Sequence, residues 1–340
     1  MTTVPKTTVP KTTVPKTFML CAVLLVAPLF AADSPIAPGA RPARLHTGGA
    51  GEGPAWSPAG SLYFSGDGRI QRRDPDGGTR VFRADSGGSN GLLFDQNGRL
   101  VICESKNRRV TRIELSGALT VLAERFEGHR FNQPNDLTID SKGRIYFSDP
   151  RYGSRDGMEM RDSKGRFVEG VYRIDAPGKV TRVISHEADR PNGVLVSPGD
   201  EFLYVADNNN NTAGGARKLW RFKLRRNGSV DAASRTLIFD WKQGRGPDGV
   251  KMDRRGRLFV AAGLNKAHPP FETAEFPGGV YVLSPAGKQL EFIPIPVDEV
   301  TNCAFGTPNL KTLFITAGGT LWSIEVDMPG RVSYERDAGH

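Results

Sequence analysis

The chain has 340 residues, 38% hydrophobic and 24% charged, so it can bury a large core as one big domain or two small ones. Its formal net charge of +9 falls to about +6 without the three lysines of the first 16 residues, and its arginines form no stripe with interleaved aromatic residues, which argues against nucleic-acid binding. Three cysteines are too few for a disulfide scaffold.

The first 32 residues predict a leader that is not part of the fold. The pentapeptide TTVPK occurs three times between Thr2 and Lys16, and the apolar run Phe18–Ala32 follows it. The run has the length of a signal-peptide core and is short for a membrane span, so we expect an exported protein, periplasmic or secreted. Because Phe30 occupies a position where a cleavage site prefers a small residue, an uncleaved N-terminal anchor remains an alternative. No other membrane partner is indicated, and residues 33–42 are expected to be a linker.

A repeat occupies most of the remaining chain. Each copy has a polar residue, a short apolar strand, a polar turn and a second apolar strand. The six copies begin at Glu52, Asn90, Asn135, Asn192, Asp248 and Asn302. Successive starts are 38, 45, 57, 56 and 54 residues apart, which is the range for one four-stranded propeller blade with its loops. The sequence therefore predicts an all-β protein, a six-bladed β-propeller over residues 43–328, and a C-terminal tail over residues 329–340.

The last copy of the repeat supplies only three strands. We expect Ala43–Thr47 to provide the missing strand and to close the ring, which would remove open sheet edges. Cys103 and Cys303 would then lie in the second and sixth blades, which are not adjacent. Both are therefore predicted to be free thiols.

The polar residue that begins each copy is a candidate site residue. The first strand of a propeller blade lies against the central channel, so the six residues should converge at one mouth of the channel. Two carboxylates with several amide oxygens are ligands that suit Ca²⁺ or a similar cation. Asn-Gly and Asp-Gly are also common turn dipeptides, which is the alternative for any single position. Six polar residues in register favour the site.

Three long connections are expected at the same mouth. They follow Asp149, Asp207 and Gly263, and each joins the second and third strands of its blade. Connections of this length in a compact domain are usually binding loops or lids.

Five motifs, spread in order from Glu52 to Gly306, carry a resemblance to a known family. They are EGPAW, FNQPND, RPNGVLVS, PDGVKMD and TNCAFG. Together they resemble the SMP-30/gluconolactonase/luciferin-regenerating-enzyme family of six-bladed propellers. The segment RIYFSDPRYG is similar to the strand that follows PND in the bacterial gluconolactonases of that family.

The resemblance implies one divalent cation, with calcium as the first candidate and zinc or magnesium as alternatives. Its ligands would be Glu52, Asn192 and Asp248, and Asn135 would be a further ligand or a contact for water and substrate. Arg130 and Asn132 stand where substrate-contacting residues of the family often occur, and Asp136, Asp149 and Tyr152 are candidates for supporting roles.

Such a site would polarise a lactone carbonyl and make a nearby water more acidic. Asp248 is the candidate general base that takes the proton. We therefore expect metal-dependent hydrolysis of a small-molecule sugar lactone, similar to gluconolactone, to the aldonic acid. The alternatives are a paraoxonase-like esterase or phosphotriesterase on the same metal site and a non-catalytic binding propeller. The oligomeric state is left open.

Overall fold

The computed structural model describes residues 1–3, 5 and 34–335. The leader expected over residues 1–32 thus lies outside the described residues, apart from those four positions. Strands dominate the described chain, whose single helical element is a 3₁₀ turn, Pro198–Asp200. Within these residues, no helix has the length and apolar character needed to cross a membrane.

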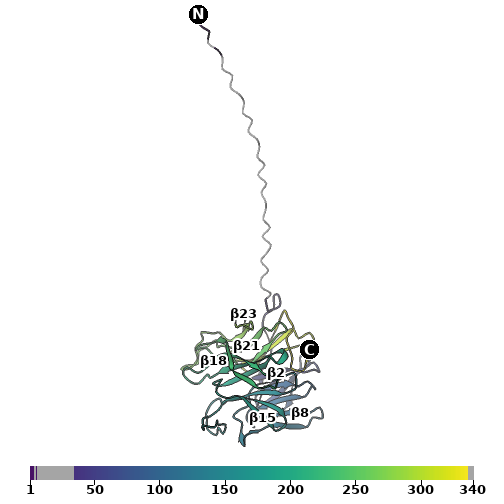
Figure 1. The fold of residues 1–340 in the computed structure, drawn as a ribbon. Coiled ribbons are helices and arrows are strands. Elements are labelled where there is room, and N and C mark those ends of the chain that lie inside the picture. Colours follow the sequence, from purple (N-terminus) through teal and green to yellow (C-terminus); the bar gives the residue numbers. More distant parts are fainter. Residues whose placement is uncertain (4, 6–33, 336–340) are drawn as a thin grey trace. The chain divides into compact units, whose positions relative to one another are not determined.

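Six antiparallel four-stranded sheets form the blades of a propeller (Figure 1). Blade 1 contains β2 (Glu52–Trp56), β3 (Leu62–Gly66), β4 (Arg69–Arg73) and β5 (Thr79–Arg83). Blade 2 contains β6 (Ser89–Phe94), β7 (Leu100–Glu104), β8 (Arg109–Ile113) and β9 (Leu119–Ala123). A small hairpin, β10 (Arg125–Phe126) and β11 (His129–Arg130), precedes blade 3, which contains β12 (Leu137–Ile139), β13 (Ile145–Asp149), β14 (Gly170–Ala176) and β15 (Lys179–Ile184). Blade 4 contains β16 (Pro191–Val196), β17 (Phe202–Asn208), β18 (Arg217–Leu224) and β19 (Val230–Asp240). Blade 5 contains β20 (Val250–Met252), β21 (Leu258–Ala262), β22 (Gly279–Leu283) and β23 (Gln289–Pro294). Blade 6 contains β24 (Val300–Gly306), β25 (Thr312–Ala317), β26 (Thr320–Glu325) and β1 (Ala43–Thr47).

The ring is closed by pairing between the first and last strands of the propeller. β1 lies antiparallel to β26, with Thr47 opposite Thr320, so the predicted closure by Ala43–Thr47 is confirmed. The predicted six-bladed, all-β architecture is confirmed with it. Ile36 also bridges Val326, so part of the segment expected to be a linker is attached to the same blade.

Each pair of neighbouring blades shares its own hydrophobic core. The buried apolar side chains form six clusters, one at each of the six interfaces between blades. All residues of the second strands β7 and β21 are buried, because both faces of these sheets pack against a neighbour. A strand buried on both faces reads as a continuous apolar run, which is how these strands appear in the sequence. Cys103 in β7 and Cys303 in β24 are buried and free, as predicted.

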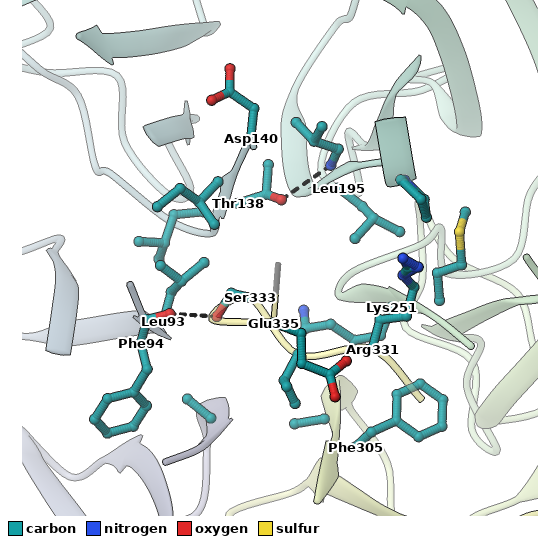
Figure 2. A pocket seen from close by; sticks show the side chains of 18 of the residues that line it. Leu93, Phe94, Thr138, Asp140, Leu195, Lys251, Phe305, Arg331, Ser333 and Glu335 are labelled. Atoms are coloured by element: carbon teal, nitrogen blue, oxygen red, sulfur yellow. Dashed lines mark hydrogen bonds between the residues drawn. The ribbon is translucent and has the colours of Figure 1, made fainter. Parts of the chain in front are cut away.

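The inner strands enclose a channel cavity of about 470 Å³, to which every blade contributes (Figure 2). Four residues of the C-terminal segment also line it: Arg331, Val332, Ser333 and Glu335. The Gly330 N–H donates to the carbonyl of Leu310 in blade 6 at 2.8 Å, and Ser333 Oγ donates to the carbonyl of Phe94 in blade 2 at 2.6 Å. The segment therefore crosses the end of the channel at which the inner strands finish.

Candidate functional site

The six residues that begin the repeat lie at the start of the inner strands, at the other end of the channel. Glu52, Asn90, Asn192 and Asn302 are within the first three residues of β2, β6, β16 and β24, and Asn135 and Asp248 precede β12 and β20 by two residues. The predicted strand starts are confirmed to within two residues. In β2, β6, β16 and β24 the pairing with the second strand shifts register beside the site residue. Such irregularities release a side chain from the regular ladder and redirect it.

Glycines next to the site residues allow neighbouring inner strands to approach closely. The Gly193 N–H donates to the carbonyl of Asp248 at 3.1 Å, and the Gly91 N–H donates to the carbonyl of Asn135 at 2.7 Å. A Cβ atom at Gly193 would lie 2.1 Å from the Asp248 carbonyl oxygen, which is far inside van der Waals contact. The Asn-Gly and Asp-Gly pairs are therefore required by packing between blades. None of them forms a turn.

Several oxygen atoms at this mouth are buried without a hydrogen-bond donor. They are Oδ1 of Asn90, Asn135, Asn192 and Asp248, and Oδ2 of Asp136. A buried acceptor without a donor costs roughly 1–3 kcal/mol, and folded proteins seldom leave several such atoms together. This concentration of oxygens without hydrogen-bond donors fits a ligand with positive charge or several donors.

Three carboxyl groups at the mouth repel one another. The pKa of Glu52 lies well above its usual value, first because the group is buried and then because of the charges of Asp248 and Asp136. Burial raises the pKa of Asp248 to about 7, against the opposing effect of the Arg245 guanidinium. A divalent cation among these groups would favour their charged forms.

Two basic side chains offset part of this negative charge. Arg245 Nη2 lies 3.5 Å from Asp248 Oδ2. Lys251 Nζ lies 3.7 Å from Asp136 Oδ2 and donates to Asn302 Oδ1 at 3.1 Å. The side-chain oxygen of Asn302 is therefore already used, unlike those of the other amides at the mouth.

The predicted ligands Glu52, Asn135, Asn192 and Asp248 all lie at this mouth, but they do not form a cluster of His, Cys and acidic groups. Within the described part of the chain, no three or more His, Cys, Asp or Glu side chains are grouped so that they could hold a metal. A cation here would need amide oxygens together with Glu52 and Asp248, which is the hard-oxygen donor set that suits Ca²⁺. The partnerless oxygens of Asn135 and Asn192 fit this requirement.

The two other predicted substrate contacts lie differently. Asn132 is fully buried, and its Nδ2 donates to the carbonyls of Asp149 and Val168 at 3.0 and 2.9 Å. Arg130 belongs to β11, and its Nη2 donates to the carbonyl of Asn107 at 3.2 Å. Both side chains are held by backbone carbonyls in this structure, so their contact with substrate stays a prediction.

Sequence reasoning missed Arg245 and Lys251 as parts of the site. Both flank the PDG motif, but a basic residue near an aspartate is common on loops and carries no distinguishing signal. The role of Lys251 depends on a carboxylate from another blade, Asp136. The long loops after Asp149, Asn208 and Ala262 do connect second and third strands, as expected.

Residues 87–91 match the GxSxG pattern of serine hydrolases, but the local structure differs from that of a nucleophile elbow. Ser89 lies within strand β6 instead of on a strand-to-helix turn. Its Oγ donates to the carbonyl of Arg69 at 3.4 Å. A serine nucleophile at this position is therefore not supported.

The fold and the mouth define a class of protein: a six-bladed propeller whose blades place carboxylates and amides at one end of the channel. The family model described as SMP-30/Gluconolactonase/LRE-like region matches residues 50–319. The chain belongs to this family.

Two lactonases are similar to this chain over most of their length. A gluconolactonase of Zymomonas mobilis subsp. mobilis is 31% identical over 291 residues, covering 78% of this chain and 75% of the relative. A 6-deoxy-6-sulfogluconolactonase of Pseudomonas putida is 29% identical over 275 residues, covering 78% and 82%. The solved structure of a gluconolactonase from Xanthomonas campestris superposes with a TM-score of 0.70 at 30% identity, covering 86% of this chain and 91% of that one.

Proposed function

We propose that this protein hydrolyses a sugar lactone to the aldonic acid with the help of one divalent cation, calcium in the first instance. The family and the gluconolactonase, pentonolactonase and sulfogluconolactonase relatives class the chain as a lactonase. The observation that carries the cation proposal is the group of buried oxygens without donors beside three mutually repelling carboxyl groups.

The proposed ligands are Glu52, Asn135, Asn192 and Asp248. A divalent cation held by them would supply Lewis acidity, which polarises a carbonyl and lowers the pKa of a nearby water. Asp248 would accept a proton from the attacking water, and Arg245, 3.5 Å away, would keep that carboxylate in place. Water would add to the carbonyl carbon, the ring C–O bond would break, and the ring oxygen would take the proton from Asp248 and become the hydroxyl group of the open acid.

The test is a lactone panel measured after chelation and after readdition of single metals. Gluconolactone, an unsubstituted valerolactone, a long-chain acyl lactone and a phosphotriester are compared at fixed enzyme concentration, with the spontaneous rates subtracted. We expect chelation to abolish gluconolactone hydrolysis and calcium to restore it better than zinc or magnesium.

Each other outcome points to a different function. Full activity in chelator would refute the requirement for a cation. Preference for the phosphotriester or an apolar lactone would favour the paraoxonase-like alternative, and no turnover of any substrate would favour a binding propeller.

We also propose export, to the periplasm or the outside of the cell. The support is the apolar run Phe18–Ala32 and its length. Cell fractionation, with N-terminal sequencing of the mature chain, separates a cleaved leader from a retained anchor. Recovery of the full-length chain in the cytoplasm would refute export.

A further inference from the structure

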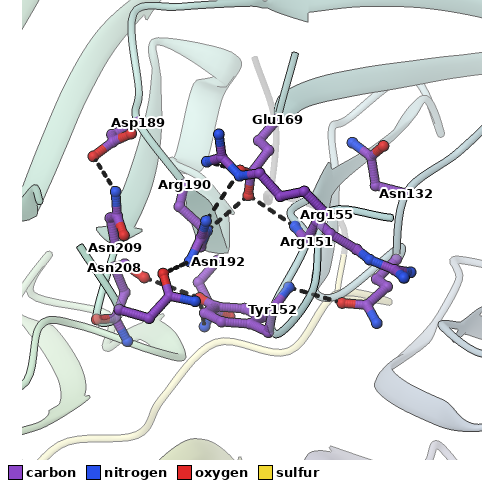
Figure 3. A network of polar contacts seen from close by, with 12 residues as sticks. Asn132, Arg151, Tyr152, Arg155, Glu169, Asp189, Arg190, Asn192, Asn208 and Asn209 are labelled. Atoms are coloured by element: carbon purple, nitrogen blue, oxygen red, sulfur yellow. Dashed lines mark hydrogen bonds and ion pairs between the residues drawn. The ribbon is translucent and has the colours of Figure 1, made fainter. Parts of the chain in front are cut away.

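The side-chain amide of Asn192 is oriented by a tyrosine from the preceding blade. Asn192 Nδ2 donates to the hydroxyl of Tyr152 at 2.8 Å (Figure 3). That hydroxyl donates in turn to the carbonyl of Asn208 at 3.3 Å. A phenol has one hydrogen to give, so with Asn208 as its acceptor it can only accept from Asn192. The amide therefore directs its nitrogen to Tyr152 and leaves Oδ1 without a partner.

Tyr152 is itself fixed at both ends. Its backbone N–H donates to Gln133 Oε1 at 2.9 Å. The guanidinium of Arg190 lies over the ring, 5.4 Å from its centroid. The hydroxyl thus has little freedom to follow Asn192 if the amide turns.

A buried ion pair connects this tyrosine to the rest of its loop, residues 150–169. Arg190 is 1% exposed, and its Nε and Nη2 donate to the carboxylate of Glu169 at 2.8 and 3.2 Å. Glu169 also accepts from the backbone N–H of Arg151 at 2.8 Å and from Arg155 Nη2 at 2.6 Å. Figure 3 shows these side chains around Tyr152 and Asn192. The loop and the inner strand that carries Asn192 are therefore joined by one network.

We propose that Tyr152 is a positioning residue that holds the Asn192 amide with Oδ1 available to a cation. This inference rests on the proposed cation site. An amide that is free to rotate by half a turn would present Nδ2, whose hydrogens repel a cation. The Glu169–Arg190 pair holds the tyrosine in place, so the loop after β13 helps to set the cation affinity.

The test measures Ca²⁺ binding to the purified full chain by calorimetry, starting from chelator-treated protein. The Tyr152→Phe variant keeps the ring under Arg190 and loses only the hydroxyl. We expect its calcium dissociation constant to rise by roughly tenfold, the lower end for loss of a group that orients a metal ligand. Its melting temperature without calcium should fall by no more than that of the control variant, because both variants lose the hydrogen bonds of one tyrosine hydroxyl.

The matched control is Tyr146→Phe. Tyr146 belongs to the same blade and is buried, and its hydroxyl lies 3.2 Å from Asp140 Oδ2 and 3.0 Å from the Gly228 carbonyl. This variant also loses a tyrosine hydroxyl with two hydrogen-bond partners, but that hydroxyl has no hydrogen bond to Asn192. Calcium affinity should be unchanged in this variant.

A second arm separates orientation from general loosening. Asn192→Asp presents an oxygen whichever way the group turns, so adding Tyr152→Phe to it should change calcium affinity by less than about twofold. An equal loss in both backgrounds would overturn the positioning role.

The remaining outcomes distinguish this inference from the proposed function. Wild-type calcium binding with an unchanged Tyr152→Phe variant would refute the inference alone. Absence of calcium binding by the wild type would refute both.

Discussion

The side chain of Asp248 is held by one long contact, 3.5 Å from its Oδ2 to Arg245 Nη2, while its Oδ1 has no partner. Its charge also raises the pKa of Glu52. Without a cation, the carboxyl groups at the mouth repel one another, and this repulsion lowers the stability of the folded protein. This is the usual relation between a functional site and stability, in which the groups that bind the ligand weaken the ligand-free protein.

The first prediction follows for Asp248→Asn. The variant keeps the shape but removes the proposed base and one negative charge, so lactone hydrolysis should fall by roughly 10²–10⁴-fold. In chelator its free energy of unfolding should be higher than that of the wild type, by about 0.5–2 kcal/mol. Turnover rates and chelator-treated melting curves measure both effects. Asp231→Asn, on the outer strand β19, serves as the control. Wild-type turnover by the Asp248→Asn variant would show that Asp248 is not the base.

The repeat explains which residues of the site could be predicted from the sequence. Six candidate positions could be predicted because each occupies the same place in its own copy, and the family resemblance implies Glu52, Asn192 and Asp248 among them as cation ligands. Lys251 has no equivalent position to compare, and the family resemblance implies only a supporting role for Tyr152. What each of the two side chains does depends on contacts with other blades. Such contacts follow from the path of the chain in space, which the repeat does not describe.

The inner strands show why glycine follows a site residue. At Gly193 the neighbouring backbone is so close that a Cβ atom would meet the Asp248 carbonyl oxygen at 2.1 Å. At Gly51, one residue before Glu52, the nearest atom to a Cβ would be the Ser65 carbonyl oxygen at an ordinary 3.7 Å. Substitution by alanine should therefore affect stability differently at these two glycines.

The second prediction compares Gly193→Ala with Gly51→Ala. Gly193→Ala forces the fourth and fifth inner strands apart, and it should destabilise the protein by about 1–3 kcal/mol, as overpacking does. Gly51→Ala should change stability by less than about 1 kcal/mol. Denaturant unfolding of both variants is the measurement. Equal stability of the two would mean that the close approach of these strands is unimportant.

Glu104 joins the outer strand of blade 1 to blade 2. Its carboxylate accepts from Arg83 at 2.8 Å and Thr111 at 2.9 Å through Oε1, and from Arg109 at 2.7 Å and Asn107 at 2.8 Å through Oε2. Burial favours the protonated form, but these hydrogen bonds outweigh it and lower the pKa of Glu104. The folded state thus binds the proton less readily than the unfolded chain.

The third prediction concerns Glu104→Gln and pH. A lowered pKa in the folded state means that the stabilisation is complete above the unfolded pKa of about 4.3 and is lost as the pH falls through the folded value. The variant should be less stable than the wild type by about 1–3 kcal/mol at pH 7. The difference should shrink below about pH 4 as Glu104 in the wild type takes up a proton. Thermal unfolding at both pH values tests this, and a constant difference would contradict it.

At the scale of the whole molecule, the blade count and the closing strand were predictable because six similar units with one missing strand admit few arrangements. The path of the chain after the last blade was not predictable, since residues 329–335 have neither a strand period nor a repeat. Their position comes from contacts such as the packing of Tyr334 against the core between blades 1 and 2. The register shifts at the mouth could not be predicted either, because these inner strands have no alternating apolar pattern that an extra residue would interrupt.

The fourth prediction is a truncation that removes residues 329–340. It takes away the hydrogen bonds to Leu310 and Phe94 and the packing of Tyr334. The free energy of unfolding should fall by about 3 kcal/mol, by the scale of one partly buried aromatic side chain and two hydrogen bonds. Lactone turnover at saturating cation should persist, because the site lies at the other end of the channel. Removing only residues 336–340 is the control. Equal melting temperatures for both truncations would show that residues 329–335 do not stabilise the propeller.

The pairing of β1 with β26 also determines the order in which the molecule can be completed. The partners Thr47 and Thr320 are about 270 residues apart in the chain, so the first strand has no partner until the last blade has formed. Until then β26 presents an unpaired edge, and β1 is a free strand that matches it. Two incomplete molecules at high concentration can therefore exchange these strands, each closing the ring of the other, and refolding at rising protein concentration should yield swapped dimers.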